Sequence, residues 1–306
     1  MPEKIYSQKS VALSLPKTIY YIFISTRPKQ WIKNILVFAG LFFAKDVFDV
    51  AKITDAFLAF IAFCLISGSV YLINDFFDLE KDAQHPLKKY RPLPSGKLSP
   101  YTAIVAALIL MAVAIIGGFL LNLYFGIMLA VYVLLNLAYS VYFKRVVILD
   151  VMIIASGFMF RAVGGTLAIH EPVSSWFILC TIFLALFLAL SKRRAELITL
   201  GENAIHTRKS LEQYDSKFLD QMITVVTTGC LMSYALYTLD EQTVAKFGHQ
   251  RLLWTIPFVI YGLFRYLYMV YKKQDGEAPE NAILGDRPLL VCIGLYALTV
   301  FIIIYF

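Results

Sequence analysis

The sequence predicts an all-α fold of the polytopic membrane class, a bundle of about nine transmembrane helices with its active site at the cytoplasmic side. The first observation is composition. Of 306 residues, 59% are hydrophobic and only 16% are charged, and the mean hydropathy of +0.69 is too apolar for a soluble globular protein. The second is a series of apolar runs, which suit spans of roughly 17 to 25 residues each. They lie at 31–45 (the weakest), 54–75, 100–121, 124–143, 147–168, 175–191, 217–239, 252–271 and 288–306.

The positive charges favour one orientation of these spans. With the N-terminus in the cytoplasm, 22 of the 28 lysines and arginines fall on the inner side, as the positive-inside rule requires. We therefore expect a multi-pass protein of the cytoplasmic (inner) membrane, in which 1–306 is a single transmembrane catalytic domain and 1–30 is an interfacial N-terminal segment. The net charge of +7 then faces anionic membrane lipids or an anionic substrate, and nothing indicates a nucleic acid partner.

An acidic segment interrupts the chain after the second run. If that run stays helical to its end, Asn74, Asp78 and Asp82 recur every four residues and Asp75 lies three before Asp78. Oxygen ligands on one helix face suit Mg²⁺, which usually takes one or two carboxylates together with substrate phosphates. The segment 76–98 is therefore predicted to be an Asp-rich catalytic loop, against the alternative of a solvated, mixed-charge loop. It also holds cations suited to phosphate: Lys88, Lys89, Arg91 and Lys97.

Other candidates lie at the inner ends of the spans. Lys33 and Asn34 begin the first apolar run, where a polar residue is costly unless it faces the bundle interior. The alternative for this stretch is an interfacial anchor. Tyr139 and Lys144 close the fourth run, although Lys144 also fits a simple positive-inside stop.

Cations also mark the fifth and sixth runs. Arg161 lies in the middle of an apolar stretch, where a charge needs a polar cavity or a partner. The sixth run ends in a cationic cytoplasmic loop, 192–216, which is expected to act as a lid or as a solvated connector. Its first residues are the candidate phosphate ligands Lys192, Arg193 and Arg194, followed by Glu196.

The motif Asn74-x-x-x-Asp78-x-x-x-Asp82, followed by Arg91-Pro92-Leu93 between the second and third spans, resembles the UbiA-type intramembrane prenyltransferases. The resemblance covers essentially the whole chain. It implies an all-helical bundle with a lateral opening to lipid, in which Asp-rich loops hold Mg²⁺ and a diphosphate substrate.

The sequence departs from that family at one place. Most members carry a second Asp-rich motif after the sixth span, and here that position holds the run from Ser191 to Glu196. This substitution of cations for acids is similar to the decaprenyl-phosphate phosphoribosyltransferase branch. The branch implies that phosphoribosyl diphosphate is the donor, that a polyprenyl phosphate lipid is the acceptor, and that the product feeds cell-envelope glycolipid synthesis.

On this basis we expect a Mg²⁺-dependent transfer of 5-phosphoribose, with each candidate in a stated role. The metal ligands are Asn74, Asp75, Asp78 and Asp82; the catalytic residues are Asp78, Asp82 and Lys144; the substrate-binding residues are Lys33, Asn34, Arg91, Tyr139, Arg161, Lys192, Arg193, Arg194 and Glu196. Two alternatives stay open. One is prenyl transfer from a polyprenyl diphosphate to an aromatic acceptor, and the other is transport of an organic anion.

Overall fold

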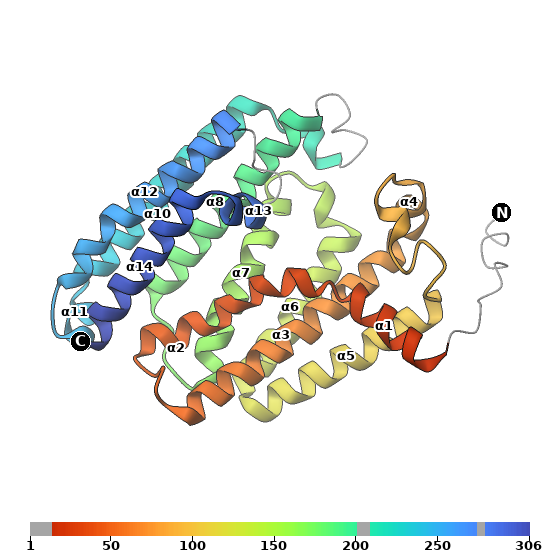
Figure 1. Ribbon diagram of the computed structural model, residues 1–306, viewed down its shortest axis with the longest axis horizontal. Coiled ribbons are helices and arrows are strands. Elements are labelled where there is room, and N and C mark those ends of the chain that lie inside the picture. Colours follow the sequence, from red (N-terminus) through yellow and green to blue (C-terminus); the bar gives the residue numbers. More distant parts are fainter. Residues whose placement is uncertain (1–13, 201–208, 274–278) are drawn as a thin grey trace. The chain divides into compact units, whose positions relative to one another are not determined.

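The computed structural model describes residues 14–200, 209–273 and 279–306, and its regular structure in these ranges is helical (Figure 1). Eight helices within the described ranges are long and apolar enough to cross a membrane, which confirms the predicted class. The run expected at 31–45 is instead divided between a 3₁₀ helix, η1 (Pro28–Val37), and the short α2 (Phe38–Ala44). The expectations for 1–13 and for 201–208, part of the predicted lid, lie outside the described residues.

The chain forms two compact units. The first comprises the described residues up to 41, residues 46–140 and residues 164–171. Its helices are α1 (Leu15–Ser25), η1, most of α2, α3 (Val50–Phe77), α4 (Leu79–Gln84), η2 (Lys88–Tyr90), α5 (Pro100–Leu121) and α6 (Leu123–Val141). The long α3 and α5 lie side by side.

Helix starts in the first unit follow from capping residues. The Asp49 carboxylate accepts hydrogen bonds from the backbone N–H groups of Ala51 and Lys52 and so begins α3. Ser99 caps α5, with Pro100 at the first position of the helix. Each cap satisfies backbone donors that have no partner inside the helix.

A small apolar core fixes the loop between α3 and α5. Leu93 and Leu98 are buried against Leu72 and Ile73 near the end of α3. Because Leu93 is anchored, Arg91, which lies two residues before it, cannot move far. The loop therefore holds Arg91 close to the end of α3.

The second unit comprises 42–45, 141–163 and 172–306, of which 201–208 and 274–278 are outside the described ranges. Its elements are η3 (Phe143–Arg145), most of α7 (Leu149–Ala168), α8 (Ser175–Leu200), η5 (Lys209–Gln213), α10 (Ser216–Leu239), α11 (Glu241–Phe247), η6 (Arg251–Thr255), α12 (Ile256–Tyr268), η7 (Met269–Lys273), α13 (Pro279–Gly285) and α14 (Arg287–Tyr305). α8 packs against α10 and α12 against α14. A core around Phe187, Leu219 and Tyr266 joins them.

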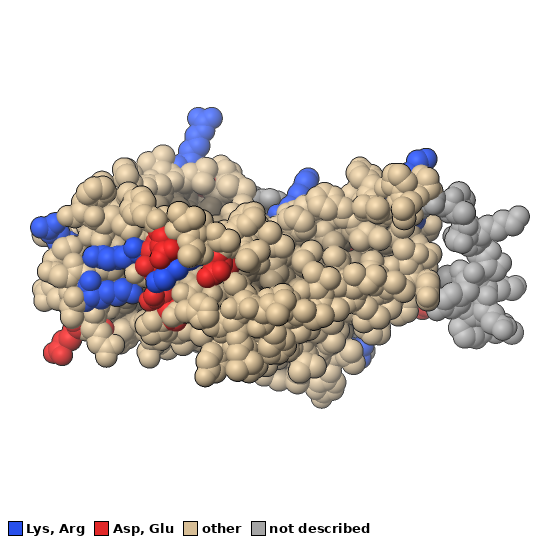
Figure 2. Space-filling view, turned by 90° about the horizontal axis from the view of Figure 1, so that it is seen from below, with Lys and Arg blue, Asp and Glu red and all other residues tan. Residues whose placement is uncertain are grey.

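The surface agrees with a membrane protein. On the face drawn in Figure 2, uncharged side chains cover most of the area and charged side chains of both signs gather mainly in one patch. Large apolar side chains are exposed along the long helices, among them Leu108, Leu120 and Leu134. In a bilayer these side chains contact lipid tails, so their exposure is not a defect of packing.

The end of α7 makes a very close backbone approach within the first unit. A Cβ atom built on Gly165 would lie 1.8 Å from the carbonyl oxygen of Val37, and one on Gly40 would lie 2.8 Å from the Cα atom of Thr166. Small residues at such positions let helices in membranes approach closely. Position 165 therefore requires glycine, so that η1 can pack against the end of α7.

We expect Gly165→Ala to destabilise the protein, because the new methyl group collides with backbone that cannot rotate away. Overpacking of this kind costs about 1–3 kcal/mol, so the apparent melting temperature in detergent should fall by several degrees. The matched control is Gly117→Ala in α5, where an added Cβ meets nothing within 4 Å. Equal melting temperatures for the two variants would contradict the close approach.

Candidate active site

The acidic segment lies where α3 ends. α3 continues to Phe77, and Asp78 serves as its C-cap with φ −97° and ψ 10° before α4 begins at Leu79. The expected single helix through Asp82 is therefore interrupted at Asp78, although the Asp82 N–H still donates to the Asp78 carbonyl at 2.8 Å. As a result the four predicted metal ligands do not all lie on one regular helix.

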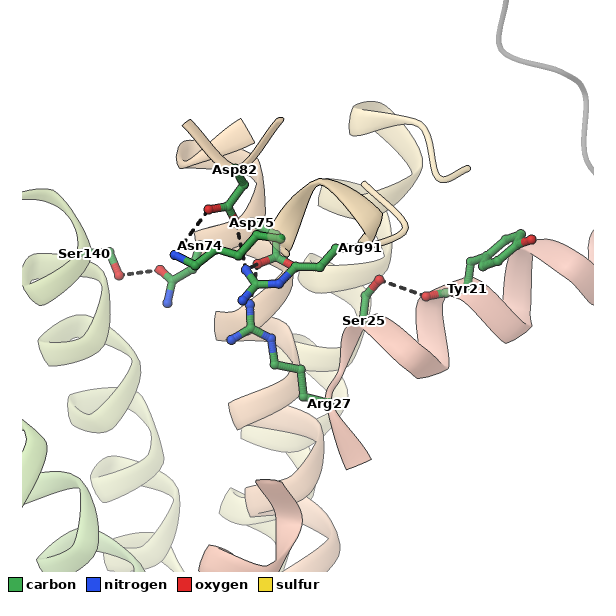
Figure 3. A network of polar contacts seen from close by, with 9 residues as sticks. Tyr21, Ser25, Arg27, Asn74, Asp75, Asp82, Arg91 and Ser140 are labelled. Atoms are coloured by element: carbon green, nitrogen blue, oxygen red, sulfur yellow. Dashed lines mark hydrogen bonds and ion pairs between the residues drawn. The ribbon is translucent and has the colours of Figure 1, made fainter. Parts of the chain in front are cut away.

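One arginine joins two of the predicted ligands. The Arg91 Nη1 atom donates to Asp75 Oδ1 at 3.1 Å and to Asp82 Oδ2 at 2.7 Å (Figure 3). Arg27 donates to the same oxygen of Asp75, and Lys88 Nζ lies 3.4 Å from Asp82 Oδ1. We call these five residues, Arg27, Asp75, Asp82, Lys88 and Arg91, the Asp75–Asp82 cluster.

Burial explains why the cluster is built from paired charges. Asp75 and Asp82 are each only 3% exposed, and two buried carboxylates close together repel one another and lose hydration. Cations in direct contact offset both penalties, and Arg91 does so for both acids at once. The carboxylates are therefore held in place before any substrate or metal binds.

Arg27, which is not among the predicted substrate-binding residues, contacts Asp75 in this cluster. Its backbone has φ 55°, a left-handed conformation that is uncommon for a residue other than glycine, and η1 starts directly after it. Its guanidinium lies 4.6 Å from the ring centroid of Tyr71, which adds a cation–π contact. The signal that could have found Arg27 is its place in the cationic run before the first apolar stretch.

The polar residues near Asn74 are partly engaged with other helices. Ser140, on α6, donates to the side-chain oxygen of Asn74 (Figure 3), and Tyr139 precedes it, half-buried. The amide nitrogen of Asn34 is 3.2 Å from Cys64 Sγ and 3.4 Å from Ser67 Oγ, both on α3. Lys33 is half-buried beside Asn34. These contacts place Asn34 in the interior of the first unit.

In the second unit the predicted cations at the end of α8 have different environments. Lys192 lies 3.8 Å from Glu196 and is half-exposed. Arg194 Nε donates to Asp220 at 2.5 Å, and its guanidinium stacks 3.8 Å from the ring centroid of Tyr271. Asp220 was not expected to take part.

Arg193 points into the second unit. Its Nε atom donates to Asp150 Oδ2 at 3.1 Å, and its Nη1 atom donates to Glu196. Ser210 and Tyr214 also donate to Asp150, at 3.1 and 2.8 Å. Burial raises the pKa of Tyr214 well above its usual value, so the hydroxyl keeps its proton for this bond. We call Asp150, Arg193, Glu196, Ser210 and Tyr214 the Asp150 network.

Two further predicted residues lie in the second unit. Lys144 is half-buried in η3. Arg161 is 7% exposed; its Nη1 atom donates to the carbonyl of Gly157 at 2.6 Å, and its guanidinium lies 5.7 Å from the ring centroid of Phe158. The Gly157 carbonyl and the Phe158 ring are thus local contacts of the Arg161 charge, for which the sequence analysis could name no partner.

The residues near the end of α3 fit a hard divalent cation in donor type. The amide oxygen of Asn74 and the carboxylates of Asp75, Asp78 and Asp82 are suitable ligands. All four residues lie on one short segment of the chain. Within the described ranges, however, no three Asp, Glu, His or Cys side chains gather closely enough to hold a metal ion by themselves. Such a set fits a metal that shares its coordination with substrate phosphates.

Comparisons with known proteins agree with this architecture. Residues 34–285 match the UbiA prenyltransferase family. The decaprenyl-phosphate phosphoribosyltransferase of Corynebacterium glutamicum is 36% identical over 270 residues, which cover 87% of this chain and 81% of that protein. The enzyme of the same name from Mycolicibacterium smegmatis is 35% identical over 299 residues, which cover 92% of this chain and 92% of that protein.

A solved structure extends the similarity to the fold. A UbiA homolog from Archaeoglobus fulgidus, bound to GPP and Mg²⁺, matches with a TM-score of 0.72 at 17% identity and covers 94% of this chain and 100% of its own. A divalent metal is thus present in a protein of the same fold. With the family match spanning most of the chain, this protein belongs to the UbiA prenyltransferase family.

Proposed function

We propose that this protein transfers 5-phosphoribose from phosphoribosyl diphosphate to a polyprenyl phosphate. The observation that carries the proposal is its similarity, over most of both chains, to relatives named decaprenyl-phosphate phosphoribosyltransferase. A second observation supports it. The end of α8 carries Lys192, Arg193 and Arg194, and a donor that carries a 5-phosphate in addition to its diphosphate needs more positive charge than a prenyl diphosphate does.

The proposed reaction is a displacement at C1 of the ribose. A phosphate oxygen of the lipid forms a bond to C1, the bond from C1 to the diphosphate oxygen breaks, and diphosphate leaves with both electrons. The products are polyprenyl-phosphoryl-5-phosphoribose and diphosphate, with inversion at C1. Because the attacking phosphate is already an anion, the protein needs to align it and to stabilise the leaving group, and no strong general base is required.

The acids at the end of α3 are proposed to hold the metal and the diphosphate. Asn74, Asp75, Asp78 and Asp82 are the ligands in this proposal, and Asp78 and Asp82 are the most important for the reaction. When bound, Mg²⁺ would neutralise the charge that develops on the leaving diphosphate. Arg91 already lies between two carboxylates, so it is well placed to contact the diphosphate.

The cations are proposed to bind the remaining phosphate charge. Lys144, Lys192 and Arg194 have this role in the second unit, and Lys33 and Arg161 have lesser roles. Tyr139, Asn34 and Glu196 would bond ribose hydroxyls or orient these cations. The buried Arg193 acts through its neighbours, as argued below.

We also propose a location and a biological setting. The excess of lysine and arginine on one side supports an inner-membrane protein with its N-terminus in the cytoplasm. The lipid acceptor would stay in the bilayer throughout. The product would serve cell-envelope glycolipid synthesis.

The reaction is tested by incubating the purified protein with labelled phosphoribosyl diphosphate, Mg²⁺ and a polyprenyl monophosphate. We expect label to enter the organic phase and diphosphate to be released. Excess EDTA should abolish both, and added Mg²⁺ should restore them. Activity only with a prenyl diphosphate and an aromatic acid would contradict the proposal and favour ordinary prenyl transfer.

A charge-removing substitution tests the role of Asp82. In Asp82→Asn the amide oxygen still accepts from Arg91, so the fold should be retained. The lost charge should weaken metal and diphosphate binding and lower kcat by about 10²–10³, the usual effect of losing one preorganised electrostatic group. The control is Glu80→Gln, an exposed acid two residues earlier on α4, which should keep wild-type activity. Equal activities for the two variants would refute the assignment.

A further inference from the structure

Asp150 lies at the start of α7 and is fully buried. Among the described residues, three side chains from two other segments of the second unit donate hydrogen bonds to its carboxylate. Tyr214 donates to Oδ1 at 2.8 Å, while Ser210 and Arg193 both donate to Oδ2 at 3.1 Å. A buried carboxylate with this many donors is held in one orientation. Asp150 therefore joins α7, α8 and the chain that precedes α10.

The Tyr214 hydroxyl has a second contact. It accepts a hydrogen bond from the backbone N–H of Ile148 at 2.7 Å. Ile148 has φ 69°, a left-handed conformation that is a genuine outlier for a β-branched residue. Such a residue keeps a strained backbone only where its surroundings impose it, and strain of this kind gathers at functional sites.

The network touches both cation-bearing segments of this unit. Lys144 lies four residues before Ile148, in η3, and η3 packs against η5. On α8, Lys192 and Arg194 flank Arg193, whose side chain is only 4% exposed. Anchoring Ile148 and Arg193 thus fixes the backbone on which Lys144, Lys192 and Arg194 are carried.

Stability alone does not explain this arrangement. Replacing a buried ion pair by well-packed apolar residues is often neutral or stabilising, and a glycine at 148 would adopt the left-handed conformation without strain. The chain instead combines a buried ion pair, a buried tyrosine hydroxyl and a strained isoleucine beside two groups of cations.

We infer that Tyr214, anchored by Asp150, is a positioning residue that holds Ile148 in its left-handed conformation and so sets the Lys144 segment for phosphate binding. Arg193 is the internal partner of Asp150 and orients its neighbours on α8. This inference rests on the proposed function, in which those neighbours and Lys144 bind the phosphates of phosphoribosyl diphosphate.

The test is Tyr214→Phe, which removes the hydroxyl but keeps the ring, the Asp150–Arg193 pair and the packing on Phe218. We expect KM for phosphoribosyl diphosphate to rise about tenfold, the effect of losing one well-placed hydrogen bond, while kcat changes by less than about twofold. A merely structural role would lower the folded fraction and the apparent kcat and leave KM unchanged.

The matched control is Tyr234→Phe. Tyr234 is also a buried tyrosine of the second unit, and its hydroxyl bonds to Thr255 at 2.6 Å, away from the Asp150 network. Its KM should equal that of the wild type. Adding Ile148→Gly to Tyr214→Phe should bring KM part of the way back, because glycine reaches the left-handed conformation without the tyrosine.

An independent readout separates this inference from the proposed function. Hydrogen–deuterium exchange should speed up in peptides covering 141–150 in Tyr214→Phe and stay unchanged in Tyr234→Phe. Faster exchange in Tyr214→Phe, combined with a wild-type protein that transfers no phosphoribose, would refute the proposed function alone. Normal transfer with an unchanged KM in Tyr214→Phe, or an equal rise in Tyr234→Phe, would overturn the positioning role.

Discussion

The pairing of buried aspartate with arginine is the interaction on which both units depend. Four aspartates are buried among the described residues, and each accepts a hydrogen bond from an arginine: Asp75, Asp82, Asp150 and Asp286. A carboxylate inside an apolar helical protein is tolerated only with a cation in contact. The apolar spans therefore determine the class of fold, and these pairs determine how its polar ends are joined.

The pairs differ in geometry. Arg265 binds Asp286 with two parallel hydrogen bonds of 3.0 and 2.9 Å, and Asp286 also caps α14 through the N–H of Leu289. This bidentate contact joins two guanidinium nitrogens to both carboxylate oxygens, and it suits a fixed connection between α12 and α14. Arg91 instead serves two carboxylates through a single nitrogen. That arrangement holds two acids together through one cation.

The sequence could predict the class of fold and the segments that carry charge, because a bilayer demands long apolar runs and penalises every charge within them. It could not predict partners that lie far apart in the chain. Arg27 and Asp75 are separated by 48 residues, and Asp150 and Tyr214 by 64. Local backbone departures were also hidden, among them the interruption of α3 at Asp78 and the left-handed Ile148. The left-handed Ile148 goes with a tertiary contact, its hydrogen bond to Tyr214, that no periodicity records.

The three adjacent cations from Lys192 to Arg194 show why the residues of one motif need not all bind the same ligand. Successive residues of a helix point in directions about 100° apart, so three adjacent cations cannot share one environment. A phosphate that binds one of them must displace its present carboxylate partner. For the half-exposed Lys192, 3.8 Å from Glu196, that exchange is cheap because exposed ion pairs contribute little. For the buried Arg193 it would leave Asp150 without its cation, at a large cost. The half-exposed Lys192 can therefore exchange its carboxylate partner at a much lower cost than the buried Arg193 can.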